Sequence, residues 1–232
     1  MANYLIVGGS SGIGKQLCEQ LVNDGHRVYA TYNLHEVSSS WDSLSYHRLN
    51  VMDENVALDF LPDELHGLVY CPGSINLKPF NRITPQNFLD DYQLQVVGAV
   101  KMIQAALPKL KNASNASIVL FSTVAVQSGL NFHSLVSSSK GAIEGLTRAL
   151  AAELAPKIRV NCIAPSLTNT PLAAALLNSE QKMEANAQRH PLKRIGSPED
   201  IAHMAQFLLS EKTSWMSGQI LHVDGGMSAL KG

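Results

Sequence analysis

A glycine-rich stretch near the start of the chain has the residue types and spacing that bind phosphate groups. Residues 7–15 read VGGSSGIGK, between an apolar run at 4–7 and an amphipathic run at 13–22, which predicts a strand, a turn and a helix. Glycines in the turn allow backbone N–H groups to approach a phosphate at the positive end of the helix. On spacing alone, an ordinary glycine-rich turn is the alternative. We predict a pyrophosphate site formed by Gly8, Ser10, Ser11, Gly12, Ile13 and Gly14.

The elements that must position this loop alternate between strand and helix along the chain. Further strands are expected at 28–31, 46–51, 68–70, 117–121, 158–163 and 219–223. Helices are expected at 54–61, from Thr84 to 111, from a Ser134 cap to 155, and from Ser197 onward. This alternation predicts an α/β fold: one doubly wound parallel sheet flanked by helices, in a single domain over residues 1–232. Ligands of such sheets bind at the carboxyl ends of the strands.

Composition excludes several classes of function. The net charge of -1 and the lack of a recognisable motif argue against nucleic acid as a partner. No apolar run is long enough to span a membrane, and the early first strand leaves no room for a signal peptide. Three widely spaced cysteines without a Cys/His cluster predict reduced thiols in a cytoplasmic protein and no metal site.

Several motifs together resemble the short-chain dehydrogenases/reductases over essentially the whole chain. The first is the glycine motif, and the second is the run RVNCIAP at 159–165. The third extends from Pro191 through the acidic helix start at 198–202 to Leu208, and the run VDGG at 223–226 closes the match. The resemblance implies a Rossmann-like sheet, an NAD(P) cofactor, and hydride transfer between an alcohol and a carbonyl of a small molecule.

The family also implies a catalytic group of Asn, Ser, Tyr and Lys, which this chain keeps only in part. Lys140 stands at the lysine position, where the family binds the cofactor ribose, but Val136 occupies the tyrosine position four residues earlier. Thr123 stands at the serine position, with Ser122 as the alternative, and Gln95 at the asparagine position. A valine cannot donate a proton, so the ordinary reaction is expected to be slow unless another group acts.

His133 is the first candidate for that other proton donor, because it lies three residues before Val136 and histidines titrate near neutral pH. A solvated loop histidine is the alternative reading, and Ser134, Ser137 and Tyr92 are weaker candidates. Three functions stay open. The chain is an oxidoreductase with an atypical proton donor, a silent cofactor-binding homologue that serves as a sensor, scaffold or inactive subunit, or a catalyst of elimination or isomerisation.

The end of the second strand favours NADP, with NAD as the alternative. A carboxylate there would hold the ribose hydroxyls of NAD, but Tyr32, Asn33 and Leu34 are neutral. The family also implies a homodimer or homotetramer. The chain itself predicts a mobile substrate flap at about 168–190. The remaining predicted cofactor contacts are Asn33, Asn50 (adenine), Gly73, Pro165 and Thr170 (nicotinamide amide).

Overall fold

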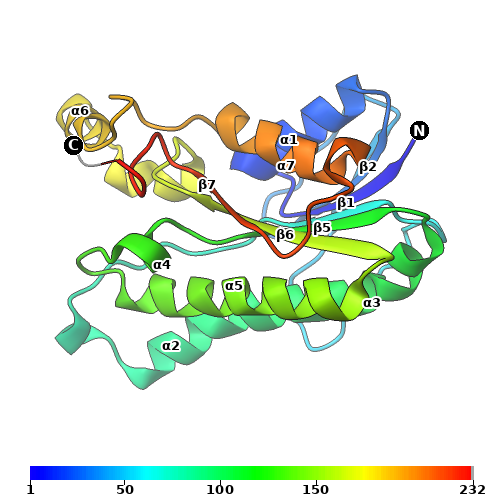
Figure 1. The fold of residues 1–232 in the computed structure, drawn as a ribbon, viewed down its shortest axis with the longest axis horizontal. Helices are drawn as coiled ribbons and strands as arrows, with labels where there is room; N and C mark the ends of the chain where they lie inside the picture. The colour runs from blue at the N-terminus through cyan, green and yellow to red at the C-terminus, as the bar shows by residue number, and fades with distance from the viewer. Residues whose placement is uncertain (231–232) are drawn as a thin grey trace.

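The structure, a computed structural model, describes residues 1–230, which form one seven-stranded sheet in which every strand pair is parallel (Figure 1). Its order is β3-β2-β1-β4-β5-β6-β7, so the direction of winding reverses between β1 and β4. The predicted doubly wound parallel sheet is confirmed. The strands are β1 (Asn3–Val7), β2 (Arg27–Tyr32), β3 (Leu44–Arg48), β4 (Gly67–Tyr70), β5 (Ala116–Phe121), β6 (Ile158–Pro165) and β7 (Ile220–Val223).

Helices cover both faces of the sheet, with α1 and α7 on one face and α2, α3 and α5 on the other (Figure 1). Alternate residues of β1 show the reason: Leu5 and Val7 belong to the core beneath α3 and α5, whereas Tyr4 and Ile6 belong to the core beneath α1 and α7. The helices are α1 (Gly12–Asn23), α2 (Pro85–Tyr92), α3 (Gly98–Asn112), α4 (Ala125–Ser128), α5 (Ser134–Leu154), α6 (Glu180–Gln188) and α7 (Pro198–Leu209). Within residues 1–230, no helix combines the length and apolarity that a membrane crossing requires.

The long helix predicted from Thr84 is present but interrupted. Thr84 and Asn87 form a reciprocal capping box at its start. A π-helical turn, Gln93–Val97, then separates α2 from α3. At this turn the Tyr70 hydroxyl donates to the carbonyl oxygen of Leu94 at 2.6 Å, and any side chain at Gly98 would collide with that hydroxyl. The wider turn and the glycine therefore let this helix lie directly against β4.

Two local predictions are wrong. Residues 54–61 do not form a helix but a loop, in which Leu58 and Leu61 are buried while Lys109 donates to the Leu61 carbonyl at 3.1 Å. A side chain from a distant segment thus provides the hydrogen bond that the Leu61 carbonyl oxygen would accept within a helix. The cap of α5 is His133 rather than Ser134, which is already the first helical residue.

Two buried polar side chains of β6 tie the sheet to the C-terminal region. The Arg159 guanidinium, 6% exposed, donates to the Leu208 carbonyl at 3.0 Å and to the Thr213 hydroxyl at 2.8 Å. The Asn161 amide donates to the Met216 carbonyl at 2.9 Å and accepts from the backbone N–H of Gln219 at 3.1 Å. The RVN motif is therefore a structural tie that fixes β7 beside β6.

Candidate functional site

The glycine loop leads into the N-terminus of α1, which no described side chain caps. Gly8 and Gly12 have φ values of +76° and +53°, which side chains rarely adopt, and a Cβ at Gly14 would collide with the Gly8 carbonyl oxygen. Ser11 occupies the N-cap position, yet among the described residues no side chain caps this helix and no acidic residue lies in its first turn. The N–H groups at the start of α1 are thus left for an external acceptor, as a dinucleotide phosphate requires.

This loop borders a cavity of about 490 Å³ at the carboxyl ends of the strands. The loop after β6 closes over it, since a Cβ at Gly12 would lie 3.4 Å from the Thr170 side chain. Asn50 lies outside the lining, and its amide is engaged by Asp53 and by the backbone of Met52. The predicted residues that line the cavity are Gly8, Ser10, Ser11, Gly12, Ile13, Gly14, Asn33, Gly73, Gln95, Thr123, His133, Lys140, Pro165 and Thr170.

Lys140 enters the cavity from α5, one turn after Val136. Desolvation is the main reason that its pKa falls from 10.5 to about 8, with a smaller opposing effect of nearby negative charge. Burial raises the pKa of Cys71 and of Cys162 to about 12, so both are neutral thiols at neutral pH. Asp91 is therefore the acidic neighbour that keeps part of the ammonium form of Lys140.

Asp91 is a buried carboxylate that sequence reasoning missed. It accepts a hydrogen bond from the Ser74 hydroxyl and a second from the Gln95 amide at 2.8 Å. These bonds leave the Gln95 Oε1 atom buried without a partner among the described residues, 3.5 Å from the position of a Cβ on Gly73. Lys140 Nζ lies 3.7 Å from the same position, so an acceptor and a donor both border the space that a side chain at residue 73 would fill. An acid four residues before Gln95, on the apolar face of the predicted helix, was the available signal.

The side chains around Val136 do not include an obvious replacement for a tyrosine. Val136 is 7% exposed and forms part of the cavity wall. Ser122 donates its hydroxyl proton to Glu144 at 2.8 Å, which leaves Thr123 as the better donor to a substrate oxygen. Ser137 donates to the Ala125 carbonyl at 3.1 Å. His133 is half-buried, and its Nδ1 atom lies 2.7 Å from the Asn131 carbonyl oxygen.

A second histidine, His190, lines the same cavity and was also missed. It follows α6, is 2% exposed, and its Nε2 atom lies 2.8 Å from the Ser166 hydroxyl. Its Nδ1 atom lies 2.9 Å from the Asn186 carbonyl oxygen. A serine directly after Pro165, beyond the carboxyl end of a predicted strand, was the available sequence signal for this pair.

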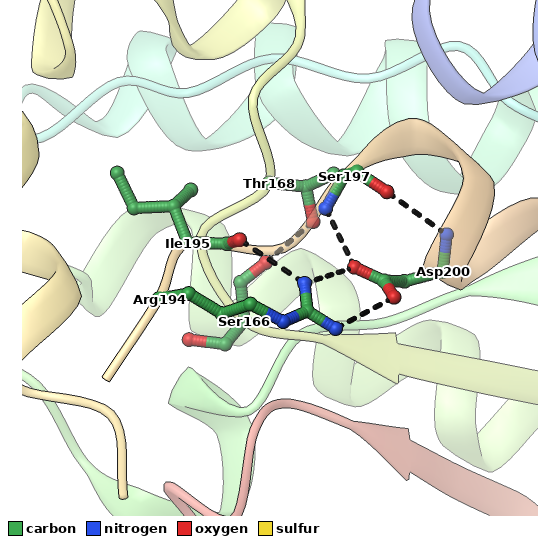
Figure 2. A network of polar contacts seen from close by, with 6 residues as sticks. All are labelled: Ser166, Thr168, Arg194, Ile195, Ser197 and Asp200. Carbon is green, nitrogen blue, oxygen red and sulfur yellow. Dashed lines mark hydrogen bonds and ion pairs between the residues drawn. The ribbon is translucent and has the colours of Figure 1, made fainter. Parts of the chain in front are cut away.

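The loop that carries Ser166 is anchored to the start of α7 (Figure 2). Thr168 donates to the Ser166 carbonyl at 3.0 Å and pairs through its backbone with Gly196. The Arg194 guanidinium donates hydrogen bonds to both carboxylate oxygens of Asp200, at 2.5 and 2.8 Å. These bonds hold the pKa of the Asp200 carboxyl well below its usual range. Asp200 also accepts from the backbone N–H of Ser197 at 2.7 Å. This network fixes one wall of the cavity.

In residues 1–230, no group of three or more His, Cys, Asp or Glu side chains is placed to hold a metal.

Comparisons with known proteins cover almost the whole chain. Residues 7–228 match the protein family described as "Enoyl-(Acyl carrier protein) reductase". A tropinone reductase homolog of Arabidopsis thaliana is 31% identical over 97% of this chain and 91% of the relative. A solved short-chain type dehydrogenase/reductase from Mycobacterium ulcerans superposes with a TM-score of 0.89 at 29% identity, covering 100% of this chain and 91% of that one. The solved structure of ElxO with NADP bound gives 0.87 at 25% identity, covering 99% of each chain.

Proposed function

This chain belongs to the short-chain dehydrogenase/reductase family of oxidoreductases, and we propose that it transfers a hydride between NADP(H) and a carbonyl or alcohol group of a small molecule. The observation that carries the proposal is one cavity lined by the glycine loop, Lys140 and Thr123. In this proposal the start of α1 holds the pyrophosphate, Lys140 binds the ribose, and Thr170 contacts the nicotinamide amide. Thr123 donates a hydrogen bond to the substrate oxygen, and Gln95 orders the surroundings of Lys140. When bound, the nicotinamide supplies or accepts the hydride.

NADP is the preferred cofactor in this proposal. Asn33 lines the cavity at the end of β2, where a neutral side chain tolerates a 2′-phosphate. The structural similarity to ElxO, solved with NADP and with NADPH, supports the same choice. A fluorescence titration with NADPH and NADH tests it. Tighter binding of NADPH is expected, whereas binding of NADH alone would overturn the preference.

The proton donor is atypical in this proposal, because Val136 occupies the place that the resemblance assigns to tyrosine. Val136→Tyr should raise the rate of carbonyl reduction at least about tenfold, since a positioned acid supplies ~10²–10⁴ in rate. Val136→Phe is the matched control, because it adds the ring without the hydroxyl. If both variants bind NADPH and reduce a broad carbonyl panel equally fast, the missing-hydroxyl account is wrong.

Val136 also supports the second candidate, a silent cofactor-binding homologue with a sensing or scaffolding role. The two functions differ in one measurement: a silent protein binds NADPH but shows no hydride transfer in a single turnover. We further propose a homodimer or homotetramer, in line with exposed Leu89 (63%) and Tyr92 (45%) on α2. Analytical ultracentrifugation tests this, and a monomer at micromolar concentration would refute it.

A further inference from the structure

We propose that Ser166 and His190 form a proton relay to the substrate oxygen, in the role left open by Val136. The inference rests on the proposed function above. It starts from contacts on the loop after β6 and on the residue that follows α6, two segments on the same side of the cavity. Ser166 is the group that meets the substrate, and His190 acts through it.

The contacts of His190 determine which ring nitrogen carries the proton. Nδ1 faces the Asn186 carbonyl oxygen at 2.9 Å, and a carbonyl can only accept. Nδ1 is therefore protonated in both charge states of the ring. In the neutral ring Nε2 must accept the Ser166 hydroxyl proton across 2.8 Å. In the charged ring Nε2–H donates to Ser166 Oγ instead.

The second state frees the Ser166 proton for another acceptor. The nearest one is the Met227 sulfur at 3.3 Å, which is a weak acceptor. A carbonyl or alkoxide oxygen in the cavity is a stronger one. The pair can therefore hold a proton ready for a substrate oxygen and replace it from the imidazole behind.

The ring is held firmly in this arrangement. His190 is 2% exposed, and a Cβ at Gly225 would lie 3.5 Å from the ring atom Cδ2, so the turn after β7 packs directly on the imidazole. Gly225 has a φ of +62°, which suits glycine at this contact. The charged groups on the neighbouring elements are Arg189, Lys193, the Arg194–Asp200 pair, and Asp224, which accepts from the backbone N–H groups of Gly226 and Ser228.

The proton balance of the relay is complete in reduction. As the carbonyl carbon accepts a hydride, the carbonyl oxygen takes the Ser166 hydroxyl proton and becomes an alcohol. The Nε2 proton of charged His190 moves to Ser166 Oγ, which leaves a neutral ring with the proton on Nδ1. Alcohol oxidation runs the same steps in reverse, and solvent restores the charge of His190 between turnovers.

The test compares single-turnover reduction of an aromatic α-diketone by NADPH in the wild type, Ser166→Ala, His190→Gln, His133→Gln and the exposed control His203→Gln. We expect Ser166→Ala and His190→Gln each to slow the reaction ~10²-fold or more with an unchanged Kd for NADPH, and the double variant to be no slower. The wild-type rate should depend on pH, and His190→Gln should lose this dependence. Ser166→Thr, which keeps the hydroxyl, and Val136→Tyr in the His190→Gln background should both restore rate.

The outcomes separate the relay from the proposed function. A wild type that binds NADPH but reduces no carbonyl refutes the proposed function, and the relay falls with it. An active wild type whose rate and pH profile survive His190→Gln, or depend on His133→Gln instead, overturns the relay alone. If His190→Gln does not fold, imidazole ¹⁵N NMR of the wild type decides: a proton on Nδ1 of the neutral ring supports the relay, and one on Nε2 overturns it.

Discussion

Replacing Lys140 by methionine should make the protein without cofactor more stable at pH 7, although it removes a functional group. The reason is the cost of keeping an ammonium in the cavity wall, which lowers its pKa from 10.5 to about 8. At about 1.4 kcal/mol per pKa unit, that difference corresponds to about 3 kcal/mol. Because Lys140 is half-buried rather than fully enclosed, we expect a gain of about 2 kcal/mol, or a rise in Tm of about 4–8 °C.

The stability difference between Lys140→Met and the wild type should depend on pH. Below pH 8 the lysine is charged in both states, so the folded protein bears the full cost. Between pH 8 and 10.5 the unfolded chain binds more protons than the folded one, and linkage makes wild-type stability rise with pH. The advantage of Lys140→Met over the wild type should therefore be largest at pH 7 and mostly vanish by pH 10.5.

Urea unfolding of the cofactor-free proteins at both pH values measures the difference. Lys182→Met, at an exposed position on α6, is the control and should change stability by less than about 0.5 kcal/mol at either pH. The reasoning fails if Lys140→Met is less stable than the wild type at pH 7, or if its advantage is the same at pH 10.5. In the same samples Lys140→Met should bind NADPH about tenfold more weakly, in accord with a loss of about 1.4 kcal/mol.

Three further substitutions test other parts of the site. Gly14→Ala should cost about 1–3 kcal/mol because its Cβ meets the Gly8 carbonyl, whereas Gly145→Ala, with open space in α5, should gain about 0.5–1 kcal/mol; equal thermal shifts would contradict this. Asp200→Asn should cost about 1 kcal/mol at pH 7, since a carboxyl with a lowered pKa stabilises fully above about pH 4 and progressively less as pH falls; a urea-unfolding difference that is undiminished at pH 2 would contradict it. Asp91→Asn should lower the pKa of Lys140 further, as lysine ¹³Cε NMR can show, and a rise would contradict the proximity of the two charges.

Local sequence signals were sufficient for the fold class and for the strand, turn and helix around the glycine loop; its binding of phosphate stays a prediction. The strand, glycine turn and helix around Gly12 are encoded within a short stretch of chain, and the capping residue Thr84 marks its own helix. The topology then follows where a helix joins two strands, as between β1 and β2 and from β4 through to β7, because a helical crossover returns the chain to a parallel neighbour; loops join β2 to β3 and β3 to β4.

The contacts around the cavity could not be predicted because they join distant segments. His190 meets Ser166 across 24 residues of chain, and Asp91 meets Ser74 across 17. Neither pair has a spacing that secondary structure imposes. The loop at 54–61 shows the same limit, since Lys109, from a helix 48 residues further on, determines its conformation. The strand expected at 46–51 is β3 (Leu44–Arg48), so Asn50 lies two residues beyond its end, where a local turn engages the amide; its contact with adenine stays a prediction.

The ties made by Arg159 also bear on how the chain is completed during its synthesis. Two acceptors of its guanidinium lie 49 and 54 residues further along, and the hydrogen-bond partners of the Asn161 side chain lie 55 and 58 residues away. While these residues are still inside the ribosome, the Arg159 guanidinium has only the upstream Asn115 side chain at 3.3 Å among the acceptors described, and burying it with most of its donors unpaired would cost several kcal/mol. Assembly of this half of the sheet is thus coupled to the synthesis of residues 208–219. A prematurely terminated chain that lacks residues beyond 207 would have an incomplete site. It would also be readily degraded by proteases.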